Sequence, residues 1–182
     1  MAKYPPTPAG TRIDSALLQS MLPEYVVKAT NTDRANTTAM SPDPDLTAPV
    51  VANAVYCVEF YIYYGGGHDT DSTADGDFVT SWEVPPGTSG LKSVIGPGAN
   101  AASSSLAHTV NSVRLGIHQL ATNVQYACVR NATNLLQLAY EQGIITIGAT
   151  PGNVTLQWAQ EASSATATRV AAGSFMRLTR LA

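Results

Sequence analysis

Charged side chains are scarce in this chain of 182 residues. They make up 13% of the sequence, about half the usual share of a soluble domain, and the formal net charge is −3. Lysines and arginines are scattered and form no basic stripe that could follow a phosphate backbone. The composition therefore argues against a nucleic-acid-binding protein. Small neutral-polar residues replace the charges, which is more typical of extracellular and virion β-proteins than of cytosolic enzymes.

Long apolar runs are absent as well. No stretch approaches the roughly 20 residues that cross a bilayer, so no membrane insertion is expected. The first ten residues, MAKYPPTPAG, lack the apolar segment of a signal peptide, and we expect the protein to be assembled in a cytoplasm. Cysteine is rare: Cys57 and Cys128 sit in apolar, strand-like runs without a metal-ligand spacing, which predicts two buried reduced thiols, with a disulfide as the alternative.

Motifs for catalysis are also missing. His68, His108 and His118 show no ligand-like spacing, and there is no P-loop or nucleophile elbow. Glu59 and Glu83 could face each other across a predicted hairpin, like the carboxylate pair of a glycosidase, but such glutamates are usually separate surface residues. The sequence thus predicts a protein that is not an enzyme and has no cofactor.

An acidic segment, GGGHDTDSTADGDF at 65–78, is the one candidate for a metal site. An EF-hand starting at Asp69 would place Thr73, Ala74 and Thr80 at loop positions 5, 6 and 12, which need an oxygen ligand, glycine and glutamate. The pattern therefore fails as an EF-hand. A solvated turn is the favoured interpretation, and the weak candidate calcium ligands are Asp69, Asp71, Asp75 and Asp77.

From Tyr25 onward the pattern of apolar residues is that of β-strands. The strongest strand is VYCVEFYIYY, in which Tyr56, Val58, Phe60 and Ile62 alternate with a second, largely apolar set. Both faces should therefore be covered, one by a sandwich core and the other by a subunit interface. The next strand, DFVTSWEV, follows the acidic loop and predicts a hairpin with a long connection.

Further strands are predicted in YVVKA, SVRLGI, VQYACV, LLQLAYEQGIITIG, VTLQWAQ and SFMRLTRLA. The segment SPDPD is expected to be a turn, and the Gly-, Ser- and Ala-rich stretch from Gly87 to Ser105 is expected to be a loop. About eight strands without crossover helices predict an all-β, jelly-roll-like β-sandwich over residues 25–182.

Residues 1–24 differ from the rest. The first ten hold three prolines and predict an extended arm. The segment TRIDSALLQSMLP follows, with a T-x-x-D start signal at Thr11 and Asp14 and a stop at Pro23, and it predicts one short helix. Its apolar residues could cover the domain's own core or dock onto another body. The docking hypothesis names Ile13, Leu17, Leu18, Met21 and Leu22.

Four stretches resemble a family of small structural proteins in phages and prophages of actinobacteria, Streptomyces especially. They are PPTPAGTRIDSALLQSMLPEYVVKATNTDRANTT at the beginning, the VYCVEFYIYY and GDFVTSWEVPPG segments, and GNVTLQWAQEASSATATRVAAGSFMRLTRLA at the end. The resemblance covers roughly the first 85 and the last 40 residues. It implies a virion or tail protein, and it brings no catalytic residues with it.

The ending is also similar to trimeric jelly rolls of the tumour-necrosis-factor type, in which a closing strand runs along the threefold axis. By that analogy SFMRLTRLA is the closing strand, and the trimer interface contains Phe175, Arg177 and Leu181. A fold-level analogy of this kind does not fix function.

These observations favour a homotrimeric surface protein of a virion, attached through its N-terminal arm to a major capsid or tail protein. A capsid decoration protein or head fibre is preferred over a tail-fibre tip, because the sequence has no coiled coil or fibrous repeat to form a shaft. The alternative is a module that binds a host glycan or receptor, with Tyr61, Tyr63, Tyr64 and Trp82 as a candidate aromatic platform.

Overall fold

The computed structural model describes residues 5, 7–67, 78–98, 113–128 and 132–182. These residues form one short helix and twelve strands, and every strand pair is antiparallel. The prediction of an all-β protein is confirmed. In chain order the elements are α1 (Ser15–Ser20), β1 (Glu24–Val27), β2 (Thr32–Arg34), β3 (Ser41–Val50), β4 (Val55–Gly66), β5 (Phe78–Glu83), β6 (Ser89–Pro97), β7 (Val113–Gln119), β8 (Val124–Tyr126), β9 (Ala132–Thr146), β10 (Gly152–Gln160), β11 (Thr168–Val170) and β12 (Phe175–Arg180).

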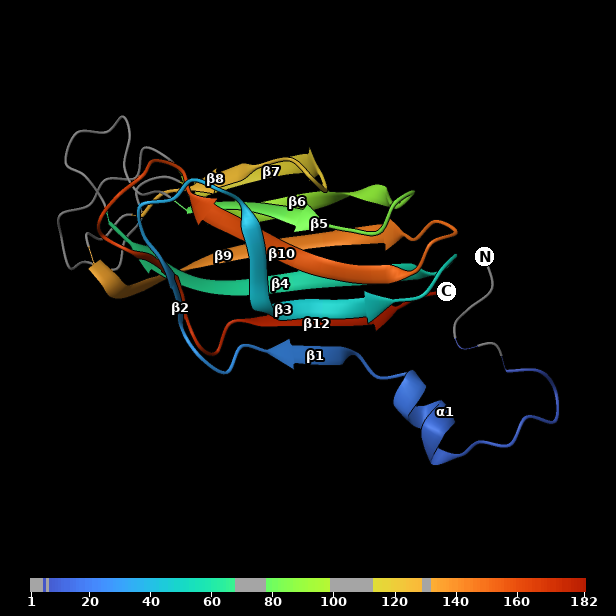
Figure 1. Cartoon of the computed structure of the whole chain (residues 1–182). Coiled ribbons are helices and arrows are strands. Elements are labelled where there is room, and N and C mark those ends of the chain that lie inside the picture. The colour runs from blue at the N-terminus through green and yellow to red at the C-terminus, as the bar shows by residue number, and fades with distance from the viewer. Residues whose placement is uncertain (1–4, 6, 68–77, 99–112, 129–131) are drawn as a thin grey trace.

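The strands form two sheets packed face to face (Figure 1). The large sheet has the order β1-β12-β4-β9-β6-β7, with β11 and β2 added beside β4, and the small sheet has the order β3-β10-β5-β8. Without β2, β6, β7 and β11, the large sheet reads β1-β12-β4-β9. This order, opposite β3-β10-β5-β8, is that of a jelly roll, in which the first strand lies beside the last. The predicted jelly-roll-like sandwich is confirmed.

The strands β6 and β7 enlarge the jelly roll. The prediction of a loop from Gly87 to Ser105 is wrong for residues 89–97, which form β6, and residues 99–105 lie outside the described residues. Strand β6 lies inside the large sheet, between β9 and β7. Its glycines are needed for close approach rather than for a turn. A Cβ on Gly90, whose φ is +148°, would lie 2.5 Å from the carbonyl oxygen of Ile144, and one on Gly96 would lie 2.5 Å from the ring of Tyr126.

The prediction of a turn at SPDPD is also wrong, because this segment begins β3. The strand is at the edge of the small sheet and pairs only with β10 among the described residues. Proline lacks an N–H, and an edge strand is where a sheet tolerates it. Pro42, Pro44 and Pro49 are exposed there, while Asp43 and Leu46 between them are buried.

The predicted hairpin around the acidic segment does not form. Strand β4 belongs to the large sheet, where it pairs with β12, β9 and β11, whereas β5 belongs to the small sheet, where it pairs with β10 and β8. The chain thus changes sheets between these two strands. Alternation alone predicts each strand but not which sheet it joins.

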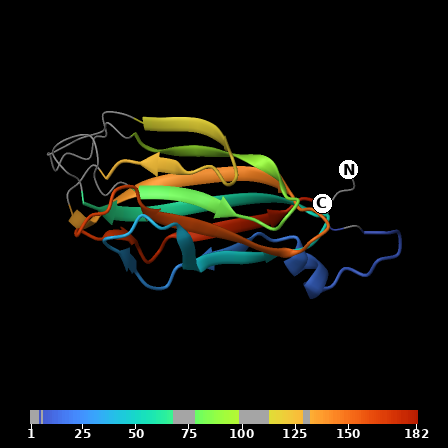
Figure 2. The same cartoon turned by 45° about the horizontal axis from the view of Figure 1, so that its top comes forward.

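The core fills the space between the inner faces of the two sheets (Figure 2). Strand β4 contributes one of its two predicted alternating sets to this core, with Val58, Phe60 and Ile62 fully buried. Large aromatic side chains dominate the contacts between the sheets: Phe60 meets Trp82 edge-on at 5.1 Å, and Tyr64 stacks on Phe78 at 4.5 Å between ring centroids.

Two buried charged clusters interrupt this apolar core. The first is centred on Glu141 of β9, which faces inward and accepts hydrogen bonds from four side chains. Trp82 Nε1 lies 2.6 Å, Tyr126 Oη 2.9 Å and Lys92 Nζ 3.0 Å from its carboxylate oxygens, and the Thr80 hydroxyl also donates to it. Burial lowers the pKa of Lys92, and the neighbouring carboxylate offsets this in part. We call this set the Glu141 cluster.

The second cluster is centred on Asp43 in β3. Lys28 Nζ lies 2.9 Å from both Asp43 Oδ1 and Asp45 Oδ2, and Trp158 Nε1 donates to Asp43 Oδ2 at 3.0 Å. The backbone N–H groups of Asp45 and Leu46 also donate to Asp43 Oδ1, at 3.0 and 3.1 Å. We call this set the Asp43 cluster. It joins β3 to the segment after β1 and to β10.

Helix α1 lies outside the sandwich, beyond the starting end of β1 (Figure 1). Asp14 caps it by accepting a hydrogen bond from the N–H of Leu17 at 2.9 Å, whereas the Thr11 hydroxyl donates to the carbonyl oxygen of Pro8. No residue of α1 is buried, so the helix does not cover the core of its own domain. No helix in the described part of the chain is long and apolar enough to cross a membrane.

Candidate functional site

The outer face of the large sheet carries the strongest signal for function. Side chains on a strand alternate between faces, so the registers define which residues point away from the core. On β4 the outer set is Cys57, Glu59, Tyr61 and Tyr63. One of the two faces of β4 was predicted to form a subunit interface, and this outward face is the one that the core does not cover. The neighbouring strands continue it on both sides.

One row of outer-face residues is apolar across six strands. Cross-strand pairs link each member to the next, so these side chains are direct neighbours on the surface. In order from β1 to β7 the row is Val27, Phe175, Tyr61, Tyr140, Ile95 and Leu115. A continuous apolar row on an outward face is unusual for a surface that meets only water.

The part of this face over β1, β12, β4 and the middle of β9 is aromatic, and we call it the aromatic half. Its rings contact one another in sequence. Tyr25 and Phe175 lie 6.2 Å apart, Phe175 stacks on Tyr61 at 4.4 Å with 13° between planes, and Tyr61 meets Tyr140 at 4.7 Å. Val27 completes this half. One ring pair is stacked and the other two are tilted, and together they form a continuous aromatic surface of the kind enriched at protein interfaces.

Polar groups in the aromatic half are paired within the chain. Arg177 forms an ion pair with Glu59, and the Tyr140 hydroxyl donates to Glu59 Oε1 at 2.9 Å. Hydrogen bonds to Tyr25 and Glu59 raise the pKa of Arg177, and burial together with Glu59 raises the pKa of the Tyr140 hydroxyl. A partner could cover this face without leaving the charge of Glu59 unpaired.

The other part of the face is aliphatic, and we call it the aliphatic half. Four of its side chains are more than half exposed: Ile117 at 73%, Leu115 at 71%, Ile144 at 60% and Val113 at 58%. Leu91 and Ile95 of β6 lie among them. The β6–β7 extension therefore presents a broad apolar surface beyond the jelly-roll core.

The three residues of the predicted trimer interface are placed at this face or beside it. Phe175 and Arg177 both point outward in the aromatic half. Leu181 lies one residue beyond β12, with its side chain exposed and its N–H donating to the carbonyl oxygen of Val55. Val113, Leu115 and Ile117 were not predicted as interface residues, although SVRLGI shows their alternation. Alternation alone cannot tell which of two faces is solvent-facing.

The aromatic platform proposed for glycan binding does not exist as one surface. Tyr64 and Trp82 are fully buried in the core, whereas Tyr61 and Tyr63 point outward from the other face of β4. The carboxylate pair is not formed either. Glu59 lies on the large sheet with Arg177, and Glu83 is exposed on the small sheet, where it accepts a hydrogen bond from Gln157 Nε2 at 2.9 Å.

The docking residues predicted for the helix remain uncovered. Ile13, Leu18, Met21 and Leu22 are exposed, and Leu17 is half-buried. The candidate calcium ligands Asp69, Asp71, Asp75 and Asp77 lie outside the described residues. Within the described residues no group of histidine, cysteine and carboxylate side chains is arranged to hold a metal ion. Cys57 and Cys128 are not joined in a disulfide; Cys128 is buried, and Cys57 is half-buried on the outer face.

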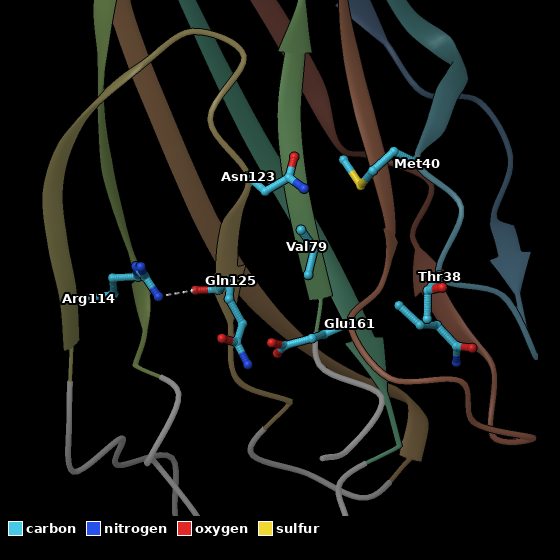
Figure 3. Close-up of a pocket in the computed structure, with 8 residues that line it drawn as sticks. Thr38, Met40, Val79, Arg114, Asn123, Gln125 and Glu161 are labelled. Atoms are coloured by element: carbon cyan, nitrogen blue, oxygen red, sulfur yellow. Dashed lines mark hydrogen bonds between the residues drawn. The ribbon is translucent and has the colours of Figure 1, made fainter. Parts of the chain in front are cut away.

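A pocket of about 290 Å³ lies on the side of the molecule opposite the outer face of the large sheet, among β5, β7, β8 and the end of β10 (Figure 3). Arg114 Nη1 donates to the carbonyl oxygen of Gln125 at 3.0 Å on one wall, and the carboxylate of Glu161 lies on another. Burial raises the pKa of Glu161, against the effect of Arg114. Thr38, Asn123 and Gln160 add polar groups to the lining, and Met40 and Val79 add apolar surface, a mixture that suits a small hydroxylated molecule.

Comparison with known proteins gives no family. No protein-family description and no curated protein matches the chain. The solved structures to which it is similar include two from infectious bursal disease virus: the Gx strain (10% identity, 88% of this chain, 40% of that chain, TM-score 0.24) and the VP2 subviral particle (9% identity, 88% and 41%, TM-score 0.22). The chain spans about 40% of the length of these proteins. At such TM-scores the jelly-roll assignment comes from the strand order alone.

Proposed function

We propose that this chain is a structural protein of a phage particle: a homotrimer on the virion surface, assembled in the host cytoplasm and attached through its N-terminal arm. The observation that carries the proposal is the pairing of two unburied apolar surfaces on a single jelly roll. One is the outer face of the large sheet, which suits contact between copies, and the other is α1, which suits contact with a larger body. The sequence resemblance to actinobacterial phage proteins supports the same class.

Within this class we favour a capsid decoration protein or head fibre, with the major capsid protein as the anchor. A tail protein as the anchor, with this chain as a tail-fibre tip, is the competing role. Cryo-electron microscopy of the whole particle distinguishes the two roles, because density for the sandwich would lie over the shell in one case and at the tail in the other.

The first test concerns the arm. Deletion of residues 1–22 should leave a domain whose melting temperature is unchanged, because α1 buries none of its residues and β1 is retained. The same deletion should abolish cosedimentation with particles assembled without this protein. Full cosedimentation of the truncated protein would contradict attachment through the arm.

A point variant sharpens this test. Leu18→Glu places a charge on an apolar side chain of α1 that is 53% exposed, and it should weaken particle binding by about 30-fold or more if Leu18 is a central contact. Gln19→Glu adds the same charge at the neighbouring exposed position of the same helix, and it should bind nearly normally. Equal effects from both variants would indicate a general loss of charge balance instead of an apolar contact.

The second test concerns the trimer. Multi-angle light scattering of the full chain at micromolar concentration should give a mass of three copies. A monomer under these conditions would contradict the homotrimer, while leaving attachment through the arm to be tested separately.

A second candidate function is recognition of a host surface glycan, and the Arg114–Glu161 pocket is the observation that favours it. Hydroxyl groups of one sugar unit could donate to the Glu161 carboxylate and accept from the Arg114 guanidinium. Arg114→Ala and Glu161→Gln should then each abolish any binding seen on a glycan array. Binding that survives both changes would place the glycan site elsewhere.

A further inference from the structure

The aliphatic half of the outer face cannot be covered by the helix of its own chain. Helix α1 leads into β1 at one edge of the large sheet, and β7 is at the other edge (Figure 1). Five strand spacings separate these two edge strands, a distance of about 24 Å at 4.8 Å per spacing. Pro23 is the only residue between Leu22 and β1, so α1 is held beside its own edge strand. Any apolar partner for the aliphatic half must come from a different surface.

We propose that the aliphatic half of one subunit packs against the aromatic half of the next subunit. This inference rests on the homotrimer of the proposed function. In a closed ring of three, each subunit contributes two different surfaces to its two neighbours, so the interface is heterologous. The aromatic half contains the predicted interface residues Phe175 and Arg177. In such a ring it contacts a different surface of the neighbouring subunit, and not the neighbour's aromatic half.

The chemistry of the two halves suits this contact. The aromatic half supplies stacked rings with an internally paired arginine, and such residues are enriched at the centre of protein interfaces. The aliphatic half supplies branched side chains with no charged residue among Leu91, Ile95, Val113, Leu115, Ile117 and Ile144. No charge from either half would be buried without a partner.

The size of the surface also fits a stable contact between copies. Monomers commonly expose single apolar patches of about 300–600 Å², and stable interfaces bury about 800 Å² on each partner. Six aliphatic side chains, each between 46% and 73% exposed, contribute apolar area on one half of the face alone. The aromatic half continues the same apolar row, from Tyr140 to Ile95.

Two single variants test the two halves separately. Leu115→Glu places a charge in the aliphatic half, and Val27→Glu places one in the aromatic half, at a side chain that is 60% exposed. Each should weaken association by roughly 30-fold or more, and each should be a folded monomer at micromolar concentration. Val51→Glu changes an exposed aliphatic residue outside the face, and it should remain a trimer.

A mixing experiment then tests the heterologous contact itself. Leu115→Glu keeps an intact aromatic half, and Val27→Glu keeps an intact aliphatic half. A mixture of the two should therefore form a dimer with one copy of each, joined by the single intact contact. Native mass spectrometry, with one variant labelled with ¹⁵N, identifies this mixed dimer by its mass.

Each outcome supports or overturns the inference. A mixed dimer from two monomeric variants supports it. A trimer that persists in Leu115→Glu, or two monomeric variants that form no mixed dimer, overturns it while the wild-type trimer stands. Circular dichroism and melting temperature must match the wild type. If Leu115→Glu is misfolded, Ile117→Gln replaces it and the same outcomes apply. A monomeric wild type overturns the proposed trimer itself, which is a separate result.

Discussion

Replacement of Glu141 by glutamine is expected to lower the free energy of unfolding by about 3–5 kcal/mol, which is the largest effect of a single change that we expect in this domain. The variant leaves Lys92 as a buried charge without a counter-ion, because within the described part of the chain Glu141 is the one carboxylate paired with its ammonium group. The amide also adds two donors to a site already crowded with the donors of Trp82, Tyr126 and Thr80. Urea unfolding followed by tryptophan fluorescence measures the loss.

A second change in the same cluster provides the control. Lys92→Met removes the buried charge and keeps a similar volume, so the double variant Lys92→Met with Glu141→Gln should be more stable than Glu141→Gln alone. A double variant that is less stable than Glu141→Gln would contradict the view that an unpaired Lys92 causes the loss. The buried pair would then contribute mainly by packing.

Replacement of Asp43 by alanine is expected to cost about 2–4 kcal/mol. The change removes the acceptor of Trp158 Nε1 and of the N–H groups of Asp45 and Leu46, and it leaves Lys28 with Asp45 alone. Loss of these bonds should loosen β3 at the edge of the small sheet. Urea unfolding gives the stability, and hydrogen exchange of the β3 amides locates the effect.

Asp45→Ala is the matched control, because its carboxylate bonds the same Lys28 nitrogen but is partly exposed. Lys28 keeps its buried partner Asp43 in this variant, so the cost should be about 1 kcal/mol or less. Equal losses in the free energy of unfolding for the two alanine variants would show that the buried Asp43 contributes no more stability than the partly exposed Asp45.

The sequence predicted the fold class because alternation is a local property. The two alternating sets of VYCVEFYIYY were grouped correctly, since Val58, Phe60 and Ile62 share the buried face and Glu59 and Tyr61 share the outward one, but the alternation did not say which set faces the core. The pairing of strands is not local. Alternation could not reveal that β4 and β5 belong to different sheets, because the choice depends on contacts with β9, β10 and β12.

Composition misled the sequence analysis at two strands for opposite reasons. Prolines in SPDPD indicate a turn, yet an exposed edge strand accepts them while Asp43 points into the core. Glycines after Gly87 indicate a loop, yet Gly90 and Gly96 serve a central strand where neighbouring atoms leave no room for a side chain. Whether a proline marks a turn, or a glycine a loop, depends on the surroundings of the residue in the fold and not on the residue type alone.

The candidate interface could be predicted in part. Phe175 and Arg177 were named by analogy, and both lie on the outer face of the large sheet; their contact with another subunit stays a prediction. The aliphatic half could not be predicted, because its location depends on β7 joining β6 at the outside of the jelly roll. The alternation in SVRLGI shows an apolar face without showing that the face is outward.

The connection between the arm and the domain has a mechanical consequence. Strand β1 pairs antiparallel with β12 over four residue pairs, from Glu24 with Leu178 to Val27 with Phe175, and α1 lies beyond the starting end of β1. A pull on the arm along the strand axis would act on the hydrogen bonds of this ladder together, in shear. The same bonds would open one after another if the pull were perpendicular. An anchor that leaves the domain along the axis of an edge strand therefore resists tension better than an anchor that leaves perpendicular to the strand, because the second geometry breaks the hydrogen bonds one at a time.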